Sequence, residues 1–184
     1  MSLIGHGGSG KTSAANYLQD EYKFTPFSFS LVIRGYAAAH SISLQKRANY
    51  ASTHAEIIRK YGWDYTLSLA LNLKADRICI DDVRSLPYAD IIRDAGGKGI
   101  AFDCPVETRF AHVHNHPDKA KYPDTLNGFI ENEREDEAIT IGAGLQFETD
   151  LLMQSADYHI DASGSLENTF RQLDEIVQPL LTRR

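Results

Sequence analysis

The sequence predicts an α/β fold of three layers, in which helices cover both faces of a five-stranded parallel sheet. Three observations support this prediction. Short apolar runs typical of buried strands alternate with longer segments of helical period. A glycine-rich loop joins the first of these strands to the first helix, and two carboxylates end a later strand. A chain of 184 residues is long enough to bury the core of one such domain, residues 1–184.

Strands are expected where apolar residues form short runs between turn residues, and helices where apolar residues recur at a spacing of three or four. The expected strands are residues 3–4, 26–29, 77–81, 98–102 and 158–160. The expected helices are residues 11–22, 31–40, 52–74, 87–95, 106–114, 125–137, 147–154 and 165–181. Because strands alternate with helices along the whole chain, the sheet is expected to be parallel.

The glycine-rich loop has the sequence Gly-His-Gly-Gly-Ser-Gly-Lys-Thr over residues 5–12 and fits the pattern G-x-x-x-x-G-K-[ST] without a departure. Such a loop turns its backbone N–H groups inward and binds phosphate at the start of a helix. It therefore predicts ATP and Mg²⁺ as cofactors. Lys11 is expected to reach the β- and γ-phosphates and Thr12 to bind the metal. The residues expected to bind ATP here are Gly5, Gly7, Gly8, Ser9, Gly10, Lys11 and Thr12.

Two carboxylates, Asp81 and Asp82, end the expected strand 77–81. In a fold with such a loop, an acidic residue at this strand end lies beside the metal ion that Thr12 holds. Asp81 is expected to be the metal partner. Asp82 is expected to face the phosphate acceptor, with capping of the following helix as an equally supported alternative.

Three arginines follow strands or lie between them at the same expected edge of the sheet. A guanidinium group grips phosphate through two parallel hydrogen bonds, so Arg34, Arg59 and Arg84 are candidates for binding a phosphorylated acceptor. Each has the alternative of an ordinary solvated arginine, and for Arg59 the sequence favours that alternative.

The chain resembles small phosphate-loop kinases of the nucleoside and deoxynucleoside monophosphate kinase group. The loop, residues 26–30, the segment Ile-Asp-Asp-Val-Arg-Ser at 80–85 and the glycine pair at 96–97 carry this resemblance. Residues 103–110, Asp-Cys-Pro-Val-Glu-Thr-Arg-Phe, are similar to archaeal adenylate-kinase-like and dephospho-coenzyme A kinase-like proteins. The resemblance covers nearly the whole chain and implies a phosphate-loop kinase fold with a small lid.

By position, the resemblance implies an acceptor-binding region at about residues 30–75 and a lid at about 112–126. It implies roles in binding the nucleotide and its phosphates for Arg109 and Arg134, and a loop against adenine at Ser163 and Gly164. Adenine stacking for Arg109, surface pairing for Arg134 and a plain turn at 163–164 are the alternatives. The lid departs from the family because it carries histidines and lysines instead of arginines. For its histidines a solvated lid is favoured over a metal site.

The resulting expectation is an enzyme that transfers the γ-phosphoryl group of ATP to a nucleoside or deoxynucleoside monophosphate, with Lys11, Asp81, Asp82, Arg84 and Arg134 in catalytic roles. The alternative is phosphorylation of a small-metabolite hydroxyl, as in dephospho-coenzyme A kinases, with Asp82 as base. A non-catalytic ATP-binding regulatory module is a more distant alternative.

The composition of the chain limits the classes of partner that we expect it to bind. The net charge of −6 is spread along the chain, so a nucleic acid partner is not expected. The sequence has neither a signal peptide nor an apolar run long enough for a membrane span, so we expect a cytoplasmic protein without a membrane partner. The expected partner is a small-molecule phosphate acceptor, bound by a monomer or a homodimer. Cys79 and Cys104 are expected to be reduced thiols of the core.

Overall fold

The computed structural model describes residues 1–44, 47–81, 83–116, 122–138 and 148–182. Five strands and nine helices lie in this part of the chain. The strands are β1 (Ser2–Ile4), β2 (Thr25–Ser28), β3 (Ile78–Asp81), β4 (Gly99–Asp103) and β5 (Tyr158–Asp161). The helices are α1 (Lys11–Tyr22), α2 (Phe29–Ala39), α3 (Arg47–Tyr61), α4 (Trp63–Leu71), α5 (Leu86–Asp94), α6 (Val106–His114), α7 (Leu126–Ala138), α8 (Thr149–Gln154) and α9 (Leu166–Thr182).

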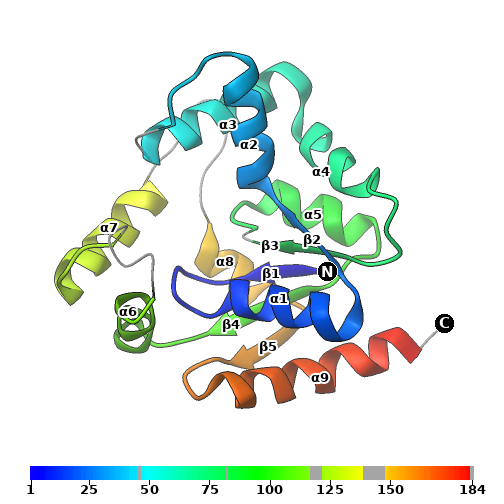
Figure 1. Ribbon diagram of the computed structural model, residues 1–184, viewed down its shortest axis with the longest axis vertical. Coiled ribbons are helices and arrows are strands. Elements are labelled where there is room, and N and C mark those ends of the chain that lie inside the picture. Colours follow the sequence, from blue (N-terminus) through cyan, green and yellow to red (C-terminus); the bar gives the residue numbers. More distant parts are fainter. Residues whose placement is uncertain (45–46, 82, 117–121, 139–147, 183–184) are drawn as a thin grey trace.

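The strands form one sheet in the order β2-β3-β1-β4-β5, and every neighbouring pair is parallel. Figure 1 shows this sheet between a layer that contains α1 and α9 and a layer that contains α4 and α5. The predicted three-layer α/β fold with a five-stranded parallel sheet is therefore confirmed. Because all strands run the same way, their carboxyl ends meet at one edge, where ligands bind in folds of this kind.

Alternation along the strands divides the core between the two faces of the sheet. Leu3 of β1 and Cys79 of β3 pack with α1 and α9 in one cluster. Their neighbours Ile4 and Ile80 point to the opposite face and pack with α4, α5 and α8 in the other cluster. Successive side chains of a strand point to opposite faces, so both faces of this sheet are buried.

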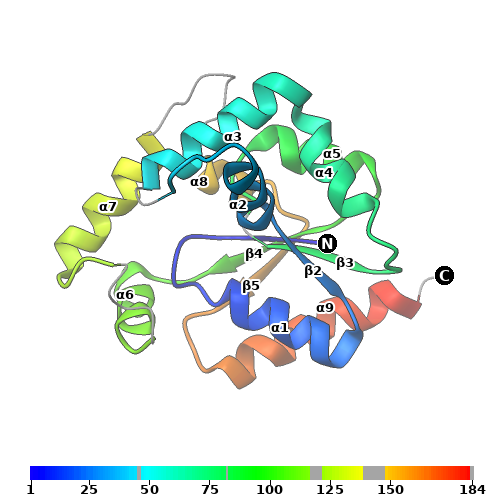
Figure 2. The same ribbon diagram turned by 45° about the horizontal axis from the view of Figure 1, so that its top comes forward.

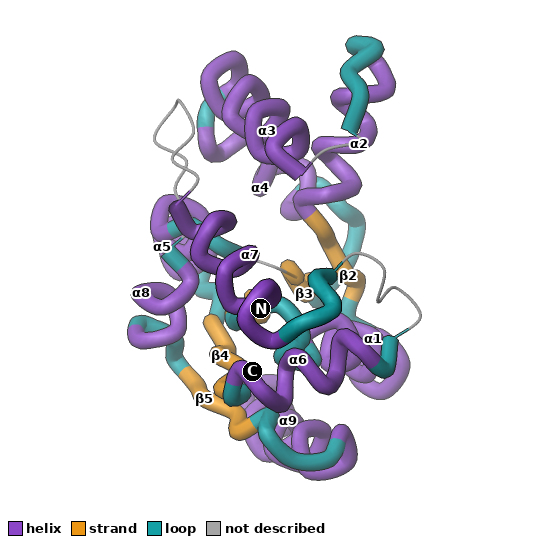
Figure 3. The backbone as a smooth tube through the Cα atoms, turned by 90° about the vertical axis from the view of Figure 1, so that its left-hand side faces the viewer, coloured by secondary structure: helices purple, strands orange, loops and turns teal. Residues whose placement is uncertain are grey.

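Helices α6 and α7 stand outside these layers, at the carboxyl edge of the sheet. Figure 2 shows them on the side of the molecule where the loop between β1 and α1 lies, and Figure 3 presents that side to the viewer, with α6 and α7 in front. The expected lid, about residues 112–126, runs from the end of α6 to the start of α7. Its residues 117–121, which include the lysines noted in the sequence, lie outside the described residues.

The expectation of one helix over residues 52–74 is wrong. Two helices, α3 and α4, occupy this region and separate at Gly62, whose backbone has φ 84° and ψ 167°. Only glycine adopts this conformation without strain, because a Cβ atom would clash with its own backbone. The break lets α4 turn back and pack against α5 and β3. The boundary between strand β2 and helix α2 also differs from the expected one, because Phe29 begins α2 instead of ending β2. Residue 147, the expected start of the helix 147–154, lies outside the described residues.

No helix in the described part of the chain is long and apolar enough to span a membrane.

Replacing Gly62 by alanine should destabilise the fold by about 1–3 kcal/mol, because alanine at this φ and ψ is strained, although no described residue beyond its chain neighbours comes within 4 Å of the added Cβ. Gly35 offers a matched control: it lies inside helix α2, and its added Cβ comes within 4 Å of no described atom outside the neighbouring helix backbone. Gly35→Ala should stabilise the fold by about 0.5–1 kcal/mol. Urea denaturation measures both changes. Equal effects of the two substitutions would contradict this account of the helix break.

Candidate functional site

Residues 5–10 of the glycine-rich loop connect β1 to α1 at the carboxyl edge of the sheet, and its last two residues, Lys11 and Thr12, begin α1. The strand, loop and helix that the motif requires are all present. Gly10 precedes α1 with φ 91°, and Gly8 has φ 79°. A Cβ on Gly8 would lie 2.7 Å from the carbonyl oxygen of Arg109, so the loop packs directly on the backbone of α6. Glycine is required here both for its backbone conformation and for this close approach.

Several features of the loop fit a phosphate group. The hydroxyl oxygen of Ser9 is buried and has no hydrogen-bond partner among the described residues. Among the described residues, no side chain caps the N-terminus of α1, where helix N–H groups and the helix dipole favour an anion. The Lys11 side chain is buried, and its ammonium donates to the carbonyl oxygens of Gly5 at 2.7 Å and His6 at 3.0 Å. The loop thus combines N–H donors, a hydroxyl and a cation.

The pair predicted to hold a metal ion comes together. The hydroxyl of Thr12, in the first turn of α1, lies 3.4 Å from the Oδ2 atom of Asp81, at the end of β3. A hydroxyl and a carboxylate are oxygen ligands suited to Mg²⁺, which keeps several waters and takes few protein ligands. The residues present therefore fit the expected ion. Asp82 lies outside the described residues, so its expected role stays a prediction.

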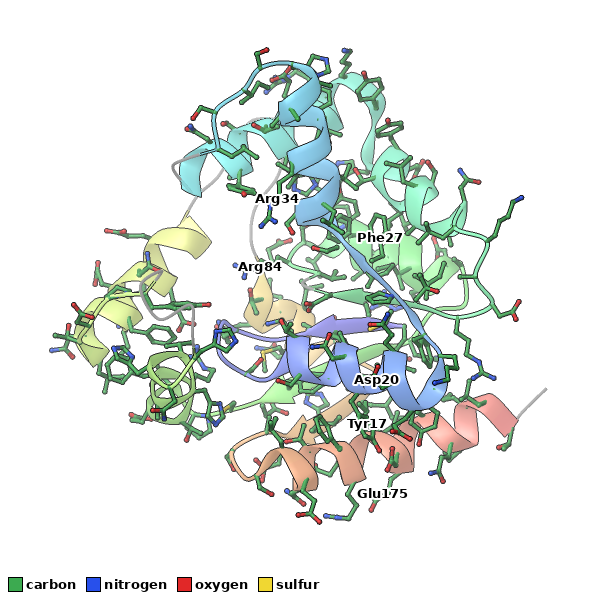
Figure 4. The ribbon with its side chains drawn as sticks, viewed as in Figure 1. Tyr17, Asp20, Phe27, Arg34, Arg84 and Glu175 are labelled. Atoms are coloured by element: carbon green, nitrogen blue, oxygen red, sulfur yellow. The ribbon has the colours of Figure 1, made fainter. Side chains whose placement is uncertain are left out.

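Two of the three candidate acceptor arginines lie in one region. Figure 4 shows Arg34, which descends from α2, and Arg84, from the segment between β3 and α5, on the same side of the molecule above the glycine-rich loop. Arg34 is exposed, and its Nε donates to the hydroxyl of Tyr50 at 3.1 Å, which fixes the direction of the guanidinium. Arg59 is exposed in the last turn of α3, where the chain leads into α4.

The residues that the family resemblance implied lie in different surroundings. Arg109 is buried and binds the carbonyl oxygens of Gly7 and Cys104, each at 3.1 Å. Arg134 is 74% exposed, and the Glu131 carboxylate of its own helix lies 3.9 Å away. Ser163 follows β5 and donates from its backbone N–H and its hydroxyl to Asp161, in a local turn. These two bonds hold the pKa of Asp161 below its usual value.

Two carboxylates that sequence reasoning missed join the loops of the site. The backbone N–H of Glu148 donates to the Arg84 carbonyl at 2.8 Å, and its carboxylate accepts from the N–H of Leu86 at 3.2 Å. Two residues on, Asp150 lies 2.8 Å from Nε2 of His6 in the glycine-rich loop. The start of α8 thus holds both the glycine-rich loop and the segment that carries Arg84. No local sequence signal marks these contacts, because their partners lie 62 and 144 residues away.

A buried polar cluster fixes the candidate acceptor region to the core. His54 of α3 lies 2.7 Å from the hydroxyl of Tyr88 in α5, which donates to Thr66 of α4 at 3.2 Å. All three side chains are buried. Burial lowers the pKa of His54 to about 4, so the imidazole is neutral at pH 7. Helix α3 carries both Tyr50 and His54, and Phe29 of α2 packs against the rings of His54 and Tyr88. The two helices that carry Arg34 and Tyr50 therefore both contact this neutral cluster.

Comparison with known proteins finds solved structures of similar fold. The sequence matches no family model and no curated protein sequence. Its fold is similar to that of shikimate kinase from Bacteroides thetaiotaomicron, with a TM-score of 0.60 and 12% identity over 96% of this chain and 97% of that chain. TT1252 from Thermus thermophilus gives a TM-score of 0.63 and 14% identity over 97% and 96%. Shikimate kinase from Acinetobacter baumannii in complex with shikimate gives 0.57 and 16% over 100% and 93%.

At these identities the comparison establishes the fold alone. It confirms the phosphate-loop kinase fold expected from the sequence, over nearly the full length of both chains. The narrower resemblance to nucleoside monophosphate kinases stays a prediction.

The neutral state of His54 should make stability depend on pH. Below pH 6.5 the unfolded chain takes up a proton on this imidazole, whereas the folded chain does so only near pH 4. Stability is therefore lost as pH falls through this window, by at most about 3 kcal/mol. Urea denaturation between pH 4.5 and 7 checks this. His54→Gln removes the titrating group, and a variant with an unchanged pH slope would show that His54 does not contribute.

Removing the Glu148 carboxylate should leave the first turn of α5 without its cap. Glu148→Ala is expected to lower the free energy of unfolding by about 1 kcal/mol, as for other helix N-caps. Glu148→Gln keeps an oxygen that accepts from the N–H of Leu86, so it should retain more than half of that stability. Urea denaturation distinguishes the two, and equal losses would show that the carboxylate does not cap the helix.

Proposed function

We propose that this protein is an ATP-dependent phosphotransferase that acts on a small anionic acceptor. The observation that carries the proposal is the convergence, at one edge of the sheet, of the glycine-rich loop, the pair Thr12 and Asp81, and the arginines Arg34 and Arg84. The loop and the pair Thr12 and Asp81 suit a triphosphate with its metal ion. The two arginines suit an anionic group on a second substrate.

Each residue has a definite part in this proposal. The N–H groups of the loop and the Lys11 ammonium bind the β- and γ-phosphates and stabilise the charge that spreads over the transferred group. Thr12 and Asp81 hold Mg²⁺, which when bound neutralises phosphate charge. Arg84, with Arg34 across from it, holds the acceptor in line. Phosphoryl transfer needs little covalent chemistry from the protein, so positioning and electrostatics supply most of the catalysis.

The first candidate acceptor is a nucleoside or deoxynucleoside monophosphate. Its phosphate is already an anionic nucleophile, so no general base is required, and two guanidinium groups suit a phosphate better than they suit a neutral hydroxyl. The arrangement of Arg34 and Arg84 supports this candidate.

The second candidate is the hydroxyl group of a small metabolite. The names of the structurally similar kinases favour it, because two of them are shikimate kinases and shikimate is not a nucleotide. A hydroxyl acceptor needs a base within hydrogen-bond reach, and Asp82, directly after β3, is the candidate by its place in the sequence.

An ADP-release assay tests the proposal. ATP·Mg²⁺ is offered with single ribo- and deoxyribonucleoside monophosphates, dephospho-coenzyme A or shikimate, with an acceptor-free reaction and Lys11→Ala as controls. Acceleration by one acceptor in the wild type, and its absence in Lys11→Ala, is the expected result. If ATP binds and no acceptor accelerates ADP release, a non-catalytic ATP-binding module becomes the better account.

Replacing Arg84 by alanine should weaken use of the acceptor far more than use of ATP. Loss of a charge-assisted hydrogen bond costs about 1.5–3 kcal/mol, so the KM for the acceptor should rise about 10- to 100-fold while the KM for ATP changes less than about threefold. Steady-state kinetics with each substrate varied in turn measures both constants. Equal increases in the two KM values would argue against the role assigned to Arg84.

A further inference from the structure

Side chains form hydrogen bonds to four successive backbone carbonyl oxygens of the glycine-rich loop. Lys11 donates to the carbonyl oxygens of Gly5 and His6, at 2.7 and 3.0 Å. Arg109 donates from Nη1 to the carbonyl of Gly7 at 3.1 Å. The Nδ1 atom of His112 lies 2.9 Å from the carbonyl of Gly8. A carbonyl oxygen only accepts, so Nδ1 of His112 carries the proton in this contact.

Two of these donors come from helix α6. Arg109 and His112 are three residues apart, so they lie on the same face of the helix. The loop rests on that face, because a Cβ on Gly8 would lie 2.7 Å from the Arg109 carbonyl oxygen and 3.0 Å from Cγ1 of Val113. Helix α6 therefore supports the loop with its backbone and with two hydrogen-bonding side chains.

The orientation of these carbonyls matters for anion binding. In a trans peptide the C=O and the following N–H point in opposite directions. A donor that fixes the Gly7 carbonyl therefore also fixes the N–H of Gly8, and keeps the negative end of that peptide away from an incoming phosphate. The N–H of Ser9 lies 3.3 Å from the His6 carbonyl and closes the turn of the loop. Fixed carbonyls make the loop a preorganised anion site.

Arg109 also connects the loop to helix α7. Its guanidinium forms an ion pair with Glu133 of α7 and lies over the ring of Phe129, 5.6 Å from the centroid. The Glu133 carboxylate would lie 3.9 Å from a Cβ on Gly7. A single buried guanidinium thus contacts the loop, the start of α6 and the helix that follows the expected lid.

We propose that Arg109 and His112 are positioning residues of the glycine-rich loop, and that Glu133 couples helix α7 to this loop through Arg109. None of the three needs to touch the nucleotide for its affinity to depend on them. This inference rests on the proposed binding of ATP at the loop. It replaces the direct contact with ATP expected for Arg109 by an indirect role, and gives His112 a role other than that of a solvated lid residue.

Substitutions at His112 test the inference most cleanly, because its side chain is exposed and its loss should leave the fold intact. The amide nitrogen of asparagine takes the place of Nδ1, whereas that of glutamine takes the place of Nε2. His112→Ala and His112→Gln should raise the Kd for ATP·Mg²⁺ about three- to tenfold, as for loss of one hydrogen bond, and His112→Asn should stay within about twofold of the wild type.

Isothermal titration calorimetry with ATP·Mg²⁺ measures these affinities, and thermal unfolding of each variant verifies the fold. His114→Ala is the matched control, because Nδ1 of His114 contacts the Phe110 carbonyl of its own helix, 3.1 Å away. Its Kd should equal that of the wild type. Equal affinities of the wild type and His112→Ala would overturn the role of His112, as would a failure of His112→Asn to bind better than His112→Gln.

Glu133→Gln tests the coupling to α7 without deleting the buried Arg109, whose removal endangers the fold. The variant loses the charge of the ion pair and should raise the Kd for ATP·Mg²⁺ at least twofold, measured at a temperature where thermal unfolding shows that the variant is fully folded. An unchanged Kd would show that α7 is not coupled to the glycine-rich loop through Glu133. If the wild type itself does not bind ATP·Mg²⁺, the proposed function fails, which is distinct from a wild type that binds and variants that bind equally well.

Discussion

An anion site made of backbone N–H groups requires that the carbonyl groups of the same loop point elsewhere and find donors there. In the anion site proposed for this protein, that constraint falls on residues 5–8. Their carbonyls are taken by Lys11 from the following helix and by Arg109 and His112 from α6. Helix α6 lies beside the loop, and the glycine at position 8 permits the close contact with its backbone.

The start of α8 extends the same arrangement to the other side of the site. Asp150 contacts the loop through His6, and Glu148 binds the backbone on both sides of Ser85. The loop proposed to bind ATP and the segment proposed to bind the acceptor are therefore fixed to one short helix. Phosphoryl transfer depends on the relative placement of donor and acceptor, so a shared support of this kind suits it.

The fold and the centre of the site could be predicted from the sequence because their signals are local. The glycine-rich loop is a contiguous motif, and Asp81 is marked by its place at the end of a buried strand. Gly62 shows the limit of periodicity, since α3 and α4 share one apolar pattern and only the backbone conformation at position 62 separates them. The contacts of Glu148, Glu133 and His112 could not be predicted, because their partners lie 62, 24 and 104 residues away in the sequence. For Arg109 the family resemblance implied a contact with the nucleotide, and the structure shows that its side chain contacts the backbone of the glycine-rich loop.

In the proposed reaction the phosphoryl group of ATP passes to a small acceptor and not to water. Phosphorus-31 NMR of a reaction that contains ATP·Mg²⁺ and the acceptor panel follows every phosphoryl group at once. We expect one acceptor to gain a phosphoryl group in the same amount as ADP forms. Formation of ADP with inorganic phosphate, and no change in any acceptor, would contradict it.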